Sequence, residues 1–127
     1  MQDAPAGRPY DVPAHYPMRY HLIVYVPVPH AQAVRDALTA AGAGRLGNYD
    51  GCSFSSRGTG RFRPLKGAKP AIGTVGKMEE VEEERIEVMV DAASEYDLKA
   101  VVAAVKKAHP YEEPAIHVMQ MADVKES

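Results

Sequence analysis

The most chemically varied stretch of this sequence is His109-Pro110-Tyr111-Glu112-Glu113-Pro114. It sets an imidazole, a phenol and two carboxylates side by side, and such a set can bind a cation, an amine or a divalent metal ion. The alternative is structural: the prolines shape the chain, His109 complements the C-terminus of a helix, and the acids pair with arginines. The residue types alone leave both interpretations open.

Cys52 is the single cysteine of the chain, so no disulfide can form within it, and a reducing, cytoplasmic compartment is expected. Cys52 and His109 could serve as a nucleophile and its base, and together with Glu112 they could hold a divalent ion. A lone cysteine within a strand is more often a small buried side chain. We therefore predict no catalytic residue and favour a protein without a reaction of its own, with a small hydrolase as a minor hypothesis.

A second group of residues is basic and lies within residues 57–77, a segment that contains no acid. Glycines interleave with the basic residues, so backbone N–H groups could join them in binding an anion. The candidates for this anion-binding loop are Arg57, Arg61, Arg63, Lys66 and Lys69. The alternative is that these cations pair with the acidic run 79–87, within one chain or between subunits.

Gly42-Ala43-Gly44-Arg45-Leu46-Gly47 matches the pattern GxGxxG. The dinucleotide fingerprint must follow a strand and open a helix. Here the glycines follow a predicted helix and precede a strand, so we do not predict a dinucleotide site.

The elements that must position these residues are indicated by hydrophobic periodicity. Apolar and β-branched runs predict strands at 20–26, 84–91 and 115–121, and helical spacing predicts helices at 31–41 and 98–105. Gly42 is placed to cap the first helix, and Ser94-Glu95-Tyr96-Asp97 matches a capping box before the second. The Gly-rich middle predicts short strands at 49–56 and 60–65 around a turn at 57–59, then an ordered loop at 67–81.

This order of elements is typical of an α+β ferredoxin-like plait (βαββαβ), here with an extra short hairpin strand and a Gly-rich loop. Both helices would cover one face of the sheet, and an open apolar face on the other side normally needs a partner. We divide the chain into a flexible N-terminal arm (1–19), a folded domain (20–121) and a C-terminal tail (122–127).

Several ordered motifs resemble the PII/CutA-like insert domain of the Nif-three-like (YqfO-type) dinuclear-metal proteins. They lie at 42–49, 52–54, 58–64, 73–77, 80–87 and 108–115. The resemblance covers residues 20–121 and implies a CutA/PII-like plait that forms a homotrimer through its sheet faces. The halves that carry the metal ligands in that family are not matched, so we expect a stand-alone domain without their metal site or hydrolase-like activity.

We therefore expect an oligomeric, non-enzymatic module that binds a small molecule or ion between subunits. The candidate ligand-binding residues are Arg45, Asn48, Tyr49, Cys52, His109, Tyr111, Glu112 and Glu113. No cofactor is assigned, and the alternatives are a divalent metal ion on His109, Glu112 and Cys52, as attributed to CutA relatives, or a trimerising cap for a separately encoded partner. The net charge of -2 argues against nucleic acid, and no apolar run approaches the roughly 20 residues that span a bilayer.

Overall fold

The structure, a computed structural model, describes residues 18–92 and 95–122. In chain order the elements are β1 (Met18–Pro27), the 3-10 turn η1 (Val28–His30), α1 (Ala31–Ala40), β2 (Phe54–Phe62), β3 (Glu79–Ala92), α2 (Glu95–Ala108) and β4 (Ile116–Gln120). The sheet is antiparallel with the order β2-β3-β1-β4, so the predicted ferredoxin-like fold class is confirmed. β1 begins inside the predicted arm, the rest of which lies outside the described residues, as do the predicted capping box at Ser94 and most of the predicted tail.

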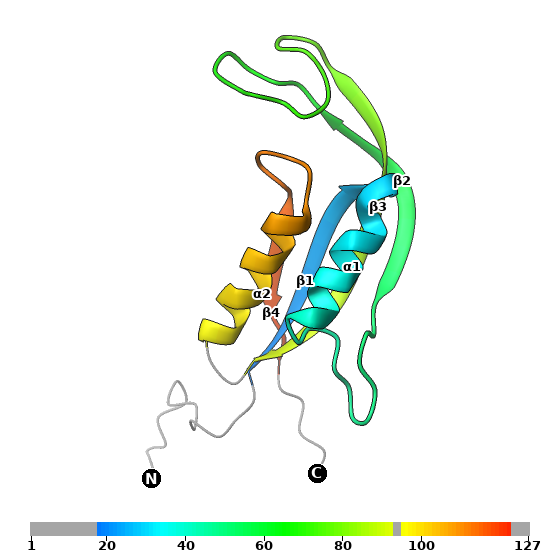
Figure 1. Cartoon of the computed structure of the whole chain (residues 1–127), viewed down its shortest axis with the longest axis vertical. Coiled ribbons are helices and arrows are strands. Elements are labelled where there is room, and N and C mark those ends of the chain that lie inside the picture. Colours follow the sequence, from blue (N-terminus) through cyan, green and yellow to red (C-terminus); the bar gives the residue numbers. More distant parts are fainter. Residues whose placement is uncertain (1–17, 93–94, 123–127) are drawn as a thin grey trace.

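The two helices lie side by side across one face of the sheet (Figure 1). Alternate residues of the central strands point at them, as the pleat of a strand requires. The strand side chains of this core are Leu22, Val24, Val26, Ile86, Val88 and Val90, and the helices add Ala31, Val34, Leu38, Val101 and Val105. The apolar stripes predicted for both helices are confirmed. None of the helices in the described part of the chain has the length and apolar character needed to cross a membrane.

β2 is one continuous strand, so the predicted hairpin at 57–59, and with it the extra strand, is wrong. Arg57, Gly58 and Thr59 all pair with β3 in unbroken register. Gly60 makes room for a neighbouring side chain, because a Cβ atom there would lie 2.1 Å from Oε1 of Glu83, whereas a Cβ atom on Gly58 would meet nothing within 4 Å. The true connection is the loop 63–78, and β3 starts earlier than predicted.

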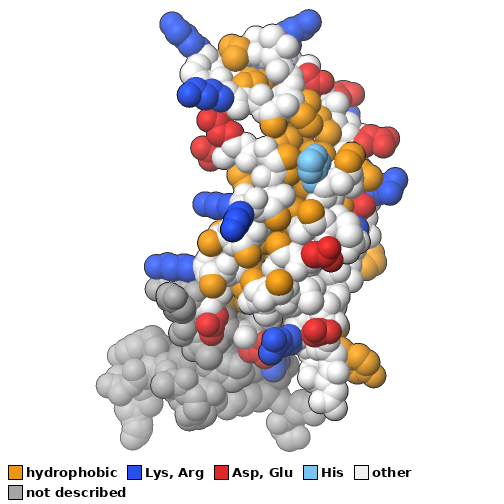
Figure 2. Space-filling model, viewed as in Figure 1, with side chains coloured by type: hydrophobic (Ala, Val, Ile, Leu, Met, Phe, Trp, Pro, Cys, Tyr) orange, Lys and Arg blue, Asp and Glu red, His pale blue; other side chains and the backbone are white. Residues whose placement is uncertain are grey.

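The β2–β3 hairpin extends beyond the helices, and its loop 63–78 curls over at the far end (Figure 1). The N–H of Gly76 donates to the carbonyl of Pro64 across the base of this loop (2.7 Å). Basic side chains stand around the end of the hairpin, with acidic side chains below them (Figure 2). Within the hairpin itself, arginines of β2 face acids of β3 across the ladder, as in the pairs Arg57–Glu84 and Arg61–Glu80.

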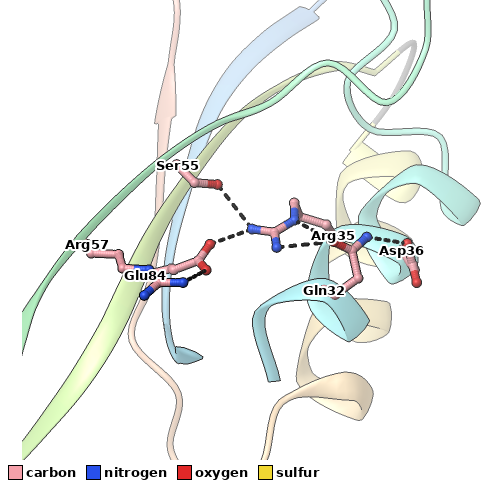
Figure 3. A network of polar contacts seen from close by, with 6 residues as sticks. All are labelled: Gln32, Arg35, Asp36, Ser55, Arg57 and Glu84. Atoms are coloured by element: carbon pink, nitrogen blue, oxygen red, sulfur yellow. Dashed lines mark hydrogen bonds and ion pairs between the residues drawn. The ribbon is translucent and has the colours of Figure 1, made fainter. Parts of the chain in front are cut away.

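Arg35 of α1 ties the helix layer to the hairpin (Figure 3). Its Nη1 contacts both the Glu84 carboxylate of β3 and Oγ of Ser55 on β2, the latter at 3.2 Å. Glu84 is only 8% exposed, and Arg57 approaches its second oxygen at 4.0 Å. A buried charge is tolerated when cations compensate it, and two do so here.

α1 ends as predicted, in a Schellman motif. The N–H groups of Gly42 and Ala43 donate to the carbonyls of Thr39 (3.1 Å) and Leu38 (2.9 Å). The chain then docks beside β3, because the Gly44 N–H donates to the Met89 carbonyl (2.8 Å). The carbonyl of Gly44 accepts the N–H of Cys52 (3.0 Å), which closes the loop between α1 and β2.

Alanine substitutions at two glycines of this loop compare two destabilising effects. One is the strain of a left-handed backbone conformation, and the other is a steric clash of the added Cβ atom. Gly44 (φ +79°) would place a Cβ 2.6 Å from the Cys52 carbonyl oxygen, whereas a Cβ on Gly47 (φ +59°) meets nothing within 4 Å. We expect Gly47→Ala to lower the free energy of unfolding by about 1 kcal/mol and Gly44→Ala by at least about 2 kcal/mol more. Urea denaturation of both variants measures the difference, and equal losses would contradict the close approach.

Candidate functional site

The predicted ligand-binding residues divide into two groups at opposite ends of the sheet (Figure 1). Arg45, Asn48, Tyr49 and Cys52 lie in the loop between α1 and β2, and residues 109–113 lie in the loop between α2 and β4. Within one chain, the second group meets the basic segment and the first group does not.

A cavity of about 730 Å³ lies where the β2–β3 hairpin meets the loop from α2 to β4. Its apolar wall includes Phe62, Leu65, Ala68 and Ile72. Its polar lining includes Arg57, Arg61, Arg63, Glu83, Tyr111 and Glu112. This volume is in the range of small-molecule sites, which combine an apolar wall with a few polar groups.

Glu83 is the most deeply buried charged group that lines the cavity, with 8% of its surface exposed. The hydroxyl of Tyr111 donates to its Oε2 (3.0 Å), and the edge of the Phe62 ring packs against Tyr111 with centroids 5.6 Å apart. Burial, together with the Glu83 carboxylate, raises the pKa of Tyr111 well above its usual range. Tyr111 therefore keeps its proton and remains a donor to Glu83.

His109 holds the loop that carries Tyr111. The backbone N–H of Tyr111 donates to Nδ1 of His109 (3.1 Å), so the proton of the neutral ring is on Nε2, which donates to the carbonyl of Tyr25 (2.7 Å). Burial lowers the pKa of His109 and favours this neutral form. Both ring nitrogens are thus engaged within the chain, which is a positioning task rather than that of a base.

The proposed pairings of Cys52 are not formed within the chain. Its thiol lies 3.9 Å from the carbonyl oxygen of Asp50. The loop between α1 and β2, which carries Cys52, lies at the end of the sheet away from the loop between α2 and β4, which carries His109 (Figure 1). Oε1 of Glu112 accepts the backbone N–H of Lys69 (3.1 Å). Across residues 18–92 and 95–122, no three His, Cys, Asp or Glu side chains gather as a metal site would require. The alternative ligand set of His109, Glu112 and Cys52 is not brought together.

The basic segment pairs in part with the acidic strand. Arg57 reaches Glu84 (4.0 Å) and Arg61 reaches Glu80 (2.9 Å), as the alternative interpretation of this charge run supposed. Both arginines also line the cavity, as does Arg63, for which the described residues provide no ion pair. Lys66 and Lys69 are exposed residues of the adjoining loop.

Sequence reasoning missed Glu83 and the apolar wall of the cavity. Glu83 was grouped with its neighbours as one acidic run, although successive strand residues face opposite sides. This alternation could have separated Glu83 from its neighbours, because it places one of each pair of adjacent acids on the side of the strand that faces the cavity. Leu65 and Ile72 carried no signal, since they lie in a loop without periodicity.

The sequence is similar to curated relatives named GTP cyclohydrolase 1 type 2 homolog. The relative from Halalkalibacterium halodurans is 48% identical over 108 residues, covering 85% of this chain and 28% of the relative. The relative from Bacillus subtilis is 50% identical over 97 residues, covering 76% and 25%. The chain thus spans about a quarter of the length of these relatives. No family model matches the sequence.

A solved structure of a Bacillus cereus protein related to NIF3 superposes with a TM-score of 0.71 at 43% identity, covering 85% of this chain and 27% of that one. The chain is thus similar to one part of these NIF3-related proteins. It corresponds to one segment of these longer proteins, which confirms the resemblance in the motifs.

Two further solved structures show how widely the fold of this NIF3-like segment is shared. CutA from Archaeoglobus fulgidus has a TM-score of 0.59 at 17% identity, covering 85% of this chain and 88% of that chain. GlnK from Bacillus subtilis, solved with ATP, has a TM-score of 0.53 at 11% identity, covering 83% and 84%. At such identities the likeness establishes the CutA/PII-like fold alone.

The neutral state of His109 predicts a pH dependence of stability. Because its pKa is lowered in the folded protein, the unfolded chain takes up a proton more readily, so this contribution is complete above the ordinary value of 6.5 and is lost as pH falls below it. We expect His109→Gln, whose amide can still reach the Tyr25 carbonyl, to flatten the dependence between about pH 7.5 and about pH 5. Urea unfolding at a series of pH values measures the slope, and an unchanged slope would exclude His109 as its source.

Proposed function

We propose that the protein is an oligomeric module of CutA/PII type that binds a small ligand or serves regulation, and that it carries out no reaction of its own. The ligand would occupy the cavity between the β2–β3 hairpin and the loop from α2 to β4. The observation that carries this proposal is the cavity itself, where an apolar wall meets the buried Glu83 carboxylate and the Tyr111 hydroxyl. We keep the cytoplasm as its proposed compartment.

The local chemistry favours binding over catalysis. His109, the natural base of the region, uses both ring nitrogens to fix the backbone, and Cys52 lies at the other end of the sheet. Activating a nucleophile requires a base within hydrogen-bond reach. Recognition requires only shape and a few fixed polar groups, which this cavity supplies.

The oligomer we propose is the homotrimer implied by the family resemblance, formed through the sheet face opposite the helices. This face contains Ile23, Met89 and Met119, by alternation with the core residues of their strands. It is more polar than expected, since it also carries the pairs Arg19–Asp91 (3.8 Å) and His21–Glu87 (2.9 Å). Mixed faces of this kind are usual in interfaces, whose polar groups set the register between subunits.

Native mass spectrometry of the protein, purified without added metal or chelator, tests both parts of the proposal. We expect a mass of three chains that carries a small organic molecule. A monomer would contradict the oligomer, and a mass increment equal to a divalent ion would favour the metal alternative.

A matched pair of variants places the retained molecule in the cavity. Leu65 and Met78 lie in the same loop and are similarly exposed, at 64% and 62%, but only Leu65 lines the cavity. We expect Leu65→Glu to lose the retained molecule because it puts a charge against the apolar wall, while Met78→Glu keeps it. Equal retention by both variants would place the ligand elsewhere.

A single charged substitution tests whether this sheet face forms the proposed oligomer interface. Met119 on β4 is 49% exposed and pairs with His21. We expect Met119→Lys to dissociate the oligomer to monomers at micromolar concentration, because each subunit contact would then bury an ammonium group without a partner. Ala103→Lys, on an exposed part of α2, is the control and should leave the size unchanged. Analytical ultracentrifugation of both variants decides, and an intact Met119→Lys oligomer would move the interface off this face.

A further inference from the structure

Glu83 is a buried carboxylate that meets no cation among residues 18–92 and 95–122. More than nine-tenths of its surface is buried, at 8% exposure, and among the described residues its polar contact is the Tyr111 hydroxyl at Oε2. Its neighbour Glu84 is equally buried but is compensated by Arg35 and Arg57. A charge taken out of water needs an opposite charge or several hydrogen bonds. In the described part of the chain, Glu83 has one neutral donor, the Tyr111 hydroxyl.

Three of the four arginines that line the cavity are engaged with other acids, and the fourth, Arg63, forms no ion pair with Glu83 among the described residues. Arg57 pairs with Glu84, Arg61 with Glu80 at 2.9 Å, and Arg85 with Glu87 at 3.4 Å, although all three arginines line the cavity. The protein therefore compensates the acids around Glu83 and leaves the carboxylate on the cavity wall open to an incoming group.

The position of Glu83 is built into the backbone. Its carboxylate lies over Gly60 of β2, where a Cβ atom would come within 2.1 Å of Oε1. Tyr111 fixes the other oxygen, and Phe62 packs on Tyr111 at a centroid distance of 5.6 Å. A carboxylate held on both sides in this way is preorganised for a donor that enters from the cavity.

We propose that Glu83 receives the protonated amine of a small organic ligand whose apolar or aromatic body packs against Phe62, Leu65 and Ile72. This rests on the proposed function, which places the ligand in this cavity. An ammonium group supplies both the missing charge and the missing hydrogen bonds. A metal ion fits less well, because the described residues bring no cluster of three ligating side chains together and the nearby wall is apolar.

The cavity favours a free amine over a lysine side chain of a second copy as the source of this charge. A volume of about 730 Å³ exceeds what one ammonium on an alkyl chain fills and suits a ligand with a body of its own. A single lysine side chain would leave part of this space empty beside the apolar residues that line it.

The test uses the full chain, with phenethylammonium as the probe and 2-phenylethanol as its uncharged counterpart, both titrated by isothermal calorimetry. We expect the ammonium to bind wild type about tenfold more tightly than the alcohol. Glu83→Gln should abolish this preference and leave the alcohol's affinity unchanged. The control, Glu82→Gln, removes an exposed acid of the same strand that does not line the cavity, and should keep the preference.

The outcomes separate this inference from the proposed function. Equal affinities for both probes in wild type would overturn the inference, and this comparison does not depend on the variant folding. No ammonium binding at millimolar concentration would also overturn it, as would dissociation of the oligomer by Glu83→Gln, which would assign the carboxylate to a subunit contact. Failure of the proposed site itself shows separately, as retention of the co-purified molecule by Leu65→Glu.

Discussion

Side chains along β3 point alternately to the two faces of the sheet, and this determines the surroundings of the two buried acids Glu83 and Glu84. Because successive strand residues face opposite sides, Glu83 and Glu84 enter different environments although they are neighbours in the chain. Glu84 turns toward α1, where Arg35 and Arg57 compensate it and fasten the hairpin to the helix layer. Glu83 turns toward the cavity and meets the Tyr111 hydroxyl. A single acidic run thus anchors the hairpin and gives the cavity its charge.

The geometry around Glu83 depends in turn on a buried histidine. His109 follows the last residue of α2 and grips the carbonyl of Tyr25 on β1 with one nitrogen and the backbone of Tyr111 with the other. These bonds fix where the phenol of Tyr111 can reach. Burial keeps the ring neutral, so both bonds persist at ordinary pH. The helix end, the central strand and the cavity wall are therefore linked through one side chain.

Periodicity predicted the core well, because Leu22, Val24, Ile86 and Val88 are buried for the same reason that they alternate. It failed at Gly58, because a glycine within a strand looks the same in sequence as one that permits a turn, and only the pairing of Gly58 with β3 separates the two. The residue types alone identified the loop 109–113 and the arginines of residues 57–63 as candidate binding groups. The predicted grouping of that loop with Arg45 and Cys52 was not found, because the loop between α1 and β2, which carries these two residues, lies at the other end of the sheet (Figure 1).

The cavity joins two segments that otherwise share few bonds, which makes it a place where a ligand could act on the whole module. The loop 63–78 is closed by the bond from Gly76 to Pro64 and touches the α2–β4 loop through the Lys69 N–H and Glu112. A ligand shifts a conformational equilibrium only as far as its affinity differs between the states. One that contacts Glu83 on the hairpin and Tyr111 on the other loop binds best when the two are held together. Under the proposed function, binding alone would hold these two segments together, and regulation would require no chemistry at the site.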